Sequence, residues 1–368
     1  MGAAATPVLL MDRTRIRENY RRIKNAFPNF QIAYAIKANP HDVILQILHE
    51  ENSSFETASI YEIRKLLDLG IPAEKIIYSN PVKPTSHIEE AVESGISIMS
   101  FDSLSELNKF KQVVTDWSTV KLLLRIQVPN PGSLWPLSGK FGAPFELCQN
   151  ILQEMAEQKI PLAGFTFHVG SQAEALEGWR EALRLTRLLW QQAISMGLSP
   201  NTLNIGGGFP IYLGREVPSI EQIADCIFEE LRAFKQEGIY PQHFIAEPGR
   251  YISGSAGTLL AKVIGVAERE DGFWAFLDCG VFSGMMETID GIEYPILTNA
   301  SGPVCKVTLC GPSCDSVDKM FQKEMPLPKE GDNIYFVGAG AYTTVYASQF
   351  NGYHPPQLCF VDEAELFV

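Results

Sequence analysis

Lys37 is the first residue of the chain whose type and place suggest chemistry. It lies in the segment 34–39, YAIKAN, where a hydrophobic run ends on a lysine that turn-forming residues follow. A partly buried amine at such a place has a lowered pKa and is available for a Schiff base with an aldehyde cofactor. An exposed lysine at a strand end is the alternative, and the segment alone fits both interpretations.

Three consecutive glycines, 206–208, follow the hydrophobic segment 202–205. Without side chains, their backbone amides can approach a phosphate closely. The pattern differs from the GxGxxG motif of dinucleotide-binding folds. The glycines therefore predict either a phosphate-binding loop or an ordinary turn.

The segment 247–250, EPGR, places Glu247 three residues before Arg250. A carboxylate at a strand end can pair with a protonated pyridine nitrogen and so hold the ring as an electron sink, while a guanidinium adds positive charge near a phosphate. A local ion pair in a turn is the alternative interpretation.

His168 ends the segment FTFH, and the following VGS brings Ser171 into the same loop. An imidazole there can stack on a cofactor ring, and a hydroxyl can bind phosphate. A single histidine is more commonly a core residue whose ring nitrogens are hydrogen-bonded within the protein.

The turn 311–316, GPSCDS, presents Cys314 beside Asp315. The thiol could donate a proton to a carbanion, and the carboxylate could hold an ammonium group. Taken alone, the segment also fits a plain turn with a buried cysteine.

The elements that must position these residues show a repeating pattern. From residue 12 to about residue 248, hydrophobic runs alternate with amphipathic stretches, as expected of βα units around a parallel sheet. The strands are predicted at 32–35, 76–78, 96–99, 120–126, 164–168, 202–205 and 244–246. The helices are predicted at 60–69, 103–113, 144–158, 176–196 and 220–237. About eight such units predict a (β/α)8 barrel of the α/β class.

Polar residues fall where the predicted strands end, which favours a barrel over a doubly wound sheet because barrel sites gather at the C-terminal ends of the strands. These residues are Lys37, Glu56, Asn80, His168, the glycines 206–208 and Glu247. We therefore expect them to converge on one site.

The pattern changes after Arg250 to short β-type runs separated by Gly and Pro, at 258–263, 273–278, 306–309 and 333–337. This predicts two domains: a cofactor-binding barrel over 12–248, and a β-sandwich or β-barrel-like domain over 249–368 that also includes residues 1–11. The 368 residues are long enough for both.

Composition excludes several classes of protein. The net charge of −13 opposes binding to nucleic acid or to an acidic membrane surface. No hydrophobic stretch approaches the roughly 20 residues of a membrane span, and no secretory signal is visible. The seven cysteines are scattered without a CxxC pair or metal-type spacing, so we expect no metal, reduced thiols and a cytoplasmic location.

Together the motifs resemble the fold type III pyridoxal-phosphate decarboxylases, the ornithine, lysine and diaminopimelate decarboxylase family, and within it the bacterial-type ornithine decarboxylase branch. The resemblance runs from about Thr6 to the C-terminus, in family order. It implies the alanine racemase and ornithine decarboxylase-like fold. Its motifs are YAIKAN at 34–39, FETAS at 55–59, IYSNP at 77–81, HVGS at 168–171, GGGF at 206–209, EPGR at 247–250, GPSCD at 311–315 and GAYT at 340–343.

The resemblance implies a pyridoxal 5'-phosphate cofactor and a role for each matching residue. Lys37 would hold the cofactor covalently, Glu247 would contact the pyridine nitrogen, and His168 would stack on the ring. The phosphate would be held by Ser171, Gly207, Gly208, Gly249, Arg250 and Tyr342.

The family also implies a homodimer with shared active sites, in which Cys314 and Asp315 act in the partner's site. Cys314 would protonate the α-carbon, and Asp315 would pair with the distal ammonium of a small cationic L-amino acid. L-ornithine or L-lysine would thus give a diamine and carbon dioxide. Asp290 and Phe282 are further substrate-binding residues that the resemblance implies. Glu56 and Phe282 replace an aspartate and a tyrosine common in ornithine enzymes, which changes the expected pocket.

Three rival functions stay open. A decarboxylase of a larger or diaminopimelate-like amino acid in a specialised pathway would need a cation for a distal carboxylate, where this chain has Asp315. An alanine-racemase-like enzyme would need a second base in place of the Cys-Asp turn. A noncatalytic regulator that binds a partner protein would be expected to lose residues that remain here, such as Lys37 and Cys314.

Overall fold

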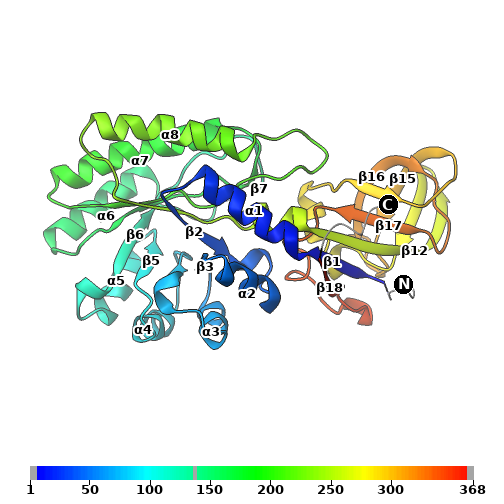
Figure 1. The fold of residues 1–368 in the computed structure, drawn as a ribbon, viewed down its shortest axis with the longest axis horizontal. Coiled ribbons are helices and arrows are strands. Elements are labelled where there is room, and N and C mark those ends of the chain that lie inside the picture. The colour runs from blue at the N-terminus through cyan, green and yellow to red at the C-terminus, as the bar shows by residue number, and fades with distance from the viewer. Residues whose placement is uncertain (1–5, 136–138, 363–368) are drawn as a thin grey trace.

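The computed structural model of the chain describes residues 6–135 and 139–362. Figure 1 shows a helix-covered barrel on one side and a curled sheet of long strands on the other. Among the described residues, no helix is long and apolar enough to cross a bilayer.

Eight parallel strands close into a barrel in the order β10-β11-β2-β3-β4-β5-β6-β8. This confirms the predicted (β/α)8 architecture. The strands are β2 (Phe30–Ala35), β3 (Ser54–Thr57), β4 (Ile76–Tyr78), β5 (Ile98–Phe101), β6 (Lys121–Arg125), β8 (Gly164–Thr166), β10 (Thr202–Asn204) and β11 (His243–Ala246).

Helices cover the outside of the barrel, and several begin at side-chain caps that their sequences supply. Ser59 and Ser103 accept the amides three residues on, and Ser219 forms a reciprocal capping box with Gln222. The helices are α1 (Arg13–Ala26), α2 (Asp42–Glu50), α3 (Ile60–Asp68), α4 (Thr85–Glu93), α5 (Leu104–Val113), α6 (Phe145–Glu157), α7 (Glu177–Ser195), α8 (Ile220–Gln236) and the short α9 (Arg250–Ser253). Single 3₁₀ turns are η1 (Ile36–Ala38), η2 (Ala73–Lys75), η3 (Trp117–Thr119) and η4 (Gly254–Ala256).

The centre of the barrel is apolar and its upper layer is polar. Ala33, Ile77, Leu123 and Ile245 form a separate buried cluster. Because side chains alternate along a strand, the residues two positions on face the same way. These are Ala35, Ser79, Arg125 and Glu247, which all line cavities at the C-terminal end of the barrel.

The second sheet has eight strands, with the order β14-β17-β12-β13-β15-β16 and with β1 and β18 joined beside β12. Its strands are β1 (Val8–Asp12), β12 (Gly257–Arg269), β13 (Gly272–Leu277), β14 (Ile296–Thr298), β15 (Val304–Cys310), β16 (Lys319–Pro326), β17 (Asn333–Val337) and β18 (Gln357–Val361). Between them lie η5 (Val281–Ser283), η6 (Met286–Asp290) and η7 (Phe350–Gly352).

The chain begins in this second sheet and then enters the barrel. β1 pairs antiparallel with β12 and parallel with β18, whereas α1 packs on the barrel side (Figure 1). The boundaries that we predict for the two domains remain a proposal, and residues 1–5 and 363–368 of the second one lie outside the described residues.

The predicted elements omit the helices α1, α2 and α4 and the strands β1, β14, β16 and β18. Three further differences lie near the polar strand ends. β3 is absent from the predicted strands because Phe55 is its one strongly hydrophobic residue, although all four of its residues are buried. β8 ends at Thr166, so His168 lies in the loop beyond the strand. That loop forms β9 (Ser171–Ala173), which pairs with β7 (Ser133–Trp135) in a small separate sheet.

Candidate active site

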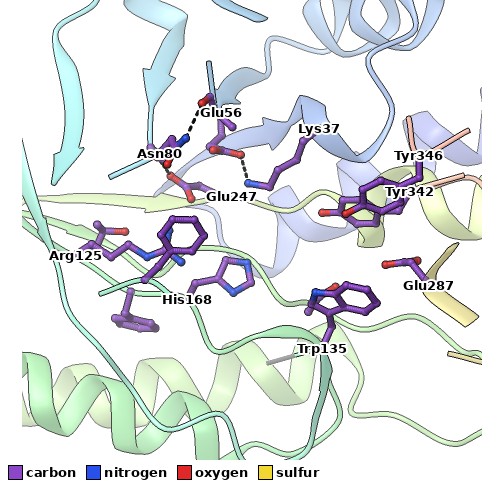
Figure 2. Close-up of a pocket in the computed structure, with 16 residues that line it drawn as sticks. Lys37, Glu56, Asn80, Arg125, Trp135, His168, Glu247, Glu287, Tyr342 and Tyr346 are labelled. Atoms are coloured by element: carbon purple, nitrogen blue, oxygen red, sulfur yellow. Dashed lines mark hydrogen bonds and ion pairs between the residues drawn. The ribbon is translucent and has the colours of Figure 1, made fainter. Parts of the chain in front are cut away.

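A cavity of about 230 Å³ lies at the C-terminal end of the barrel, where Lys37, Glu56, His168, Glu247 and Tyr342 line it together. Figure 2 shows the Lys37 amine pointing towards the two carboxylates, with His168 across the cavity. The convergence that the sequence predicts for the polar strand ends is therefore present.

Lys37 and Glu56 form an ion pair. Lys37 lies in η1, directly after β2, and Glu56 lies in β3 opposite Ala35. The Lys37 Nζ is 2.7 Å from the Glu56 Oε2, and the Glu56 side chain is 2% exposed. The Lys37 side chain is 39% exposed, because its amine lies in the cavity.

The direction of the Lys37 pKa corrects a prediction from the sequence. Burial by itself lowers the pKa of this amine, as we expected. The neighbouring charge of Glu56, with smaller contributions from Tyr342 and Glu247, outweighs burial and raises the pKa above its ordinary value. Before it reacts, Lys37 is therefore an ammonium ion held by a carboxylate.

Glu247 lies directly after β11 at the floor of the cavity. Its Oε1 accepts hydrogen bonds from the Ser79 hydroxyl and, at 2.6 Å, from the Asn204 amide. Burial and the nearby Glu56 charge raise the pKa of Glu247, while Lys37 and the two hydrogen bonds act against the rise. The carboxylate is fixed in place and can pair with a cationic ring nitrogen.

His168 is neutral and its orientation is set by the backbone. Burial, with smaller contributions from Arg125 and Lys37, holds the pKa of His168 well below its usual value. Its Nδ1 accepts the Gly170 amide at 3.0 Å, so the proton of the neutral ring is on Nε2. A neutral ring fixed in this way presents a flat face to the cavity.

No side chain fits at positions 207 and 208, because neighbouring backbone lies too close. A Cβ at Gly207 would lie 2.6 Å from the Glu247 carbonyl oxygen, and one at Gly208 would lie 2.4 Å from the Gly170 carbonyl oxygen. Gly208 also has a φ of +104°, which residues with side chains rarely adopt. The glycines therefore allow this loop to pack closely against the backbone at Glu247 and Gly170.

A smaller cavity continues from the first one, and all of the predicted phosphate ligands except Gly207 line it. Ser171, Gly208, Gly249, Arg250 and Tyr342 line it. Arg250 donates to the Ser171 hydroxyl from Nε at 3.3 Å and from Nη2 at 3.2 Å, and its Cζ lies 4.9 Å from the centre of the Tyr342 ring. We call this smaller cavity the phosphate cradle.

Tyr342 is held towards the cradle by its backbone. It has a φ of +57°, in the left-handed region that costs a non-glycine residue about 1 kcal/mol. Its amide donates to the Ala38 carbonyl at 2.8 Å, beside Lys37. This hydrogen bond ties the segment after β17 to the barrel and places the phenol at the cavity.

Cys314 and Asp315 do not line the cavity of the same chain. Both are exposed, yet their turn is ordered by Asp318, whose carboxylate accepts the amides of Ser313 and Val281 at 3.0 and 2.7 Å. The Cys314 amide also donates to Asn351 at 2.9 Å. The turn is thus a fixed surface feature.

The structure does not bring Asp290 and Phe282 to the cavity either. Asp290 is exposed at the end of η6. Phe282 packs against Phe350, with ring centres 4.7 Å apart. Their predicted contacts with the substrate are therefore not made within one chain.

Several cavity residues are absent from the predicted site: Ser79, Arg125, Trp135, Phe141, Glu287 and Tyr346. Ser79 stands inside the IYSNP segment that we used for the family resemblance, and Arg125 is the last residue but one of a predicted strand, so a sequence signal existed for these two. Trp135 and Phe141 show no comparable signal.

These residues fit pyridoxal 5'-phosphate. A lysine amine for the aldehyde, a carboxylate for the pyridine nitrogen, a neutral imidazole face and a glycine cradle with Arg250 are the complementary groups for its parts. No group of three or more His, Cys, Asp or Glu in 6–135 and 139–362 is placed to hold a metal. The fold and the site together define a pyridoxal-phosphate-binding barrel enzyme.

Comparison with known proteins gives the family. The family described as pyridoxal-dependent decarboxylase, pyridoxal binding domain, matches residues 13–254. The lysine/ornithine decarboxylase of Selenomonas ruminantium is 34% identical over 98% of this chain and 91% of its own length. The chain therefore belongs to the pyridoxal-phosphate-dependent decarboxylases, and its cofactor is pyridoxal 5'-phosphate.

Two further relatives are relevant to the choice between an enzyme and a regulator. The crystal structure of the lysine/ornithine decarboxylase from Vibrio vulnificus, complexed with cadaverine, is 35% identical, with a TM-score of 0.86 over 97% of this chain and 95% of that one. Antizyme inhibitor 2 of Xenopus laevis is 33% identical over 92% of this chain and 77% of its own length. The family thus contains proteins named for enzymatic activity and one named as an inhibitor of another protein.

Proposed function

We propose that the chain removes the α-carboxylate of a small cationic L-amino acid, L-ornithine or L-lysine, and releases a diamine and carbon dioxide. The observation that carries the proposal is the Lys37, Glu56 and Glu247 group facing His168 in one cavity. The relatives named for lysine and ornithine decarboxylation support this choice of substrate.

Each of the barrel residues has a separate role in the proposed reaction. When bound, pyridoxal phosphate withdraws electrons from the α-carbon so that the carboxylate can leave as carbon dioxide. Lys37 would hold the cofactor through its aldehyde. Glu247, fixed by Ser79 and Asn204, keeps a proton on the pyridine nitrogen. Neutral His168 would stack on the ring and exclude water there.

The glycine loop and Arg250 hold the phosphate in this proposal. Gly208 offers a backbone amide in the cradle, Ser171 and Tyr342 offer hydroxyls, and Arg250 offers a charge. Gly207, the preceding residue in the chain, would offer a second amide. Gly249 leaves room for them, because a Cβ at that position would lie 3.3 Å from the Tyr342 hydroxyl.

We propose a homodimer in which the partner completes each site. The Cys314 and Asp315 turn is exposed and rigid, as expected of a turn that a second chain receives. Cys314 then donates a proton to the α-carbon, and Asp315 pairs with the distal ammonium of the substrate. Asp290, which lies outside the cavity of its own chain, can reach substrate in the same way.

We also propose a cytoplasmic location. The seven cysteines, all within the described residues, are unpaired. Reduced thiols are usual in that compartment. Fractionation of cells that produce the chain tests the location, and recovery in a secreted fraction contradicts it.

Carbon dioxide release tests the substrate assignment. The enzyme, supplied with cofactor, is given L-ornithine, L-lysine, L-arginine and meso-diaminopimelate in parallel. We expect turnover of ornithine or lysine, and much less with diaminopimelate because Asp315 repels a distal carboxylate. Failure with all four substrates, despite bound cofactor, overturns the assignment in favour of a larger amino acid.

A noncatalytic regulator is the second candidate, favoured by the similarity to antizyme inhibitor 2. Lys37, His168, Glu247 and Arg250 nevertheless remain, and they converge on the cavities. Absorbance of the purified protein decides between the two: a cofactor band that decays on borohydride reduction supports the enzyme, and failure to take up cofactor supports the regulator.

A further inference from the structure

Arg250 has a buried partner that the proposed function does not use. Glu287, in η6 of the second sheet region, accepts hydrogen bonds from Nη1 of Arg250 at 2.9 Å and from Nη2 at 2.5 Å. The two side chains are only 3% and 5% exposed. Tyr294 donates a further hydrogen bond to Glu287 over 3.2 Å. Glu287 is thus a fixed, bidentate partner of the guanidinium.

The two edges of the Arg250 guanidinium face different groups. Its Nη1 and Nη2 edge faces Glu287, whereas its Nε and Nη2 edge faces the Ser171 hydroxyl in the phosphate cradle. A planar guanidinium held at one edge has the direction of its other edge fixed as well. Glu287 therefore sets which donors of Arg250 point into the cradle. Figure 2 shows Glu287 on the same side of the cavity as Tyr342.

The charge balance of this pair matters because it is buried. Burial by itself lowers the pKa of Arg250, but the charge and hydrogen bonds of Glu287, with smaller contributions from Tyr294 and Tyr342, together outweigh burial and hold this pKa above its usual value. An arginine buried without such a partner is strongly destabilising. Before a phosphate arrives, Glu287 supplies the negative charge that Arg250 needs. Once a phosphate is bound, the same carboxylate is a nearby like charge that weakens the attraction.

We infer that Glu287 is the resident counter-ion of Arg250: it keeps the phosphate cradle assembled before the cofactor binds, and it moderates the hold on the phosphate afterwards. Glu287 is a positioning residue that acts through Arg250. The inference rests on the proposed role of Arg250 in holding the phosphate.

The test is thermal unfolding of the full chain as holoenzyme and after removal of the cofactor, the latter with and without inorganic phosphate. For Glu287→Gln we expect the melting temperature without cofactor or phosphate to fall by about 5 °C or more. Phosphate should restore most of this loss, so the shift that phosphate causes should be larger than in the unchanged enzyme. The holoenzyme should lose less than the cofactor-free form.

Two results overturn the inference. If Glu287→Gln loses the same amount of melting temperature with and without phosphate, Glu287 is a purely structural residue. If the melting temperature does not fall at all, Glu287 does not act as a counter-ion. Should Glu287→Gln fold only in phosphate buffer, its unfolding on removal of phosphate supports the inference directly. Glu287→Asp keeps the charge, and we expect its phosphate-induced shift to match that of the unchanged enzyme.

A matched control lies far from the cradle. Glu51 is 12% exposed and is paired with Arg17 and Arg21. Glu51→Gln removes a carboxylate from an arginine pair in the same way, and any loss of its melting temperature should not depend on phosphate. Dependence on phosphate in this control also overturns the inference, because the effect would then not be local.

A paired variant separates this inference from the proposed function. Arg250→Met combined with Glu287→Leu removes both charges and leaves neither unpaired. If this variant keeps the full phosphate-induced shift, the proposed role of Arg250 is wrong and the inference falls with it. The other outcome is that the double variant loses the phosphate-induced shift in melting temperature, while Glu287→Gln loses the same amount of melting temperature with and without phosphate. In that case only the counter-ion role of Glu287 is wrong.

Discussion

Glu56 holds the Lys37 ammonium at 2.7 Å, and this pair is built by neighbouring strands of the barrel. The register of β2 and β3 sets Ala35 opposite Glu56, and η1 then turns Lys37 back over the end of β3. The carboxylate is almost fully buried, so its charge acts on the amine with little screening by water. The amine that must react is therefore kept protonated by its nearest neighbour.

Lys37→Ala should abolish both turnover and the visible absorbance of the bound cofactor, because no other amine of the described residues lies in the cavity beside Glu56 and Glu247. Lys37→Arg is the matched control: it restores a positive charge beside Glu56 but has no amine that can hold an aldehyde. We expect it to be as inactive as Lys37→Ala. Spectra and carbon dioxide release measure the two effects, and full activity in either variant contradicts the assignment.

Glu56→Gln should shift the attachment of the cofactor to lower pH. Glu56 is the largest of the influences that raise the pKa of Lys37, and burial lowers this pKa once the carboxylate is gone. Attachment needs the neutral amine, whose fraction increases about tenfold for each unit by which pH rises towards the pKa. A lower pKa therefore gives more amine and faster attachment at a fixed pH.

Stopped-flow absorbance after mixing with pyridoxal phosphate, between about pH 6 and 9, measures this shift. Glu56→Asp keeps the charge and serves as the control, with a pH dependence close to that of the unchanged enzyme. An identical pH dependence in Glu56→Gln would show that Glu56 does not govern the Lys37 amine.

Glu247→Gln should lower turnover by about 100-fold or more while the cofactor remains bound, because an amide cannot stabilise a proton on the pyridine nitrogen as a carboxylate does. Ser79→Ala removes one of the two hydrogen bonds to the same carboxylate and leaves its charge. It should cost far less activity. Steady-state carbon dioxide release and cofactor absorbance measure both variants, and near-normal turnover of Glu247→Gln would exclude its proposed role.

Much of the fold follows from the sequence because hydrophobic runs that alternate with amphipathic helices leave few options other than a parallel barrel. The strand ends then locate Lys37, Glu247 and the glycine loop without any structure. We did not predict β3, because Ser54, Glu56 and Thr57 are polar yet buried and the strand has no continuous hydrophobic pattern. Local patterns do not reveal burial that the rest of the barrel imposes.

The rest of the site depends on contacts between distant parts of the chain. Glu287 reaches Arg250 across 37 residues, and Tyr342 reaches the Ala38 carbonyl from the far end of the chain. Neither contact leaves a periodic signal in the sequence. The lowered pKa that we predicted for Lys37 was wrong for the same reason. The YAIKAN segment indicates burial of the amine, but it does not indicate where Glu56 lies relative to it.

The shared active site makes a prediction about mixed dimers. Lys37→Ala and Cys314→Ala should each have little activity alone, Cys314→Ala because the proton donor is lost. When the two chains are mixed and allowed to exchange, half of the dimers contain one chain of each kind. Each such dimer has one site with an intact Lys37 and an intact Cys314 if the cysteine comes from the partner. Activity should therefore recover to about a quarter of that of the unchanged enzyme.

A second mixture provides the control for this experiment. Lys37 and Glu247 line the same cavity of one chain, so Lys37→Ala mixed with Glu247→Gln leaves every site with at least one defect. It should show no recovery. Recovery in both mixtures would mean that exchange merely stabilises the chains. Recovery in neither, with dimer exchange verified by a tag, would place Cys314 outside the partner's site and leave its exposed, rigid turn without a catalytic role.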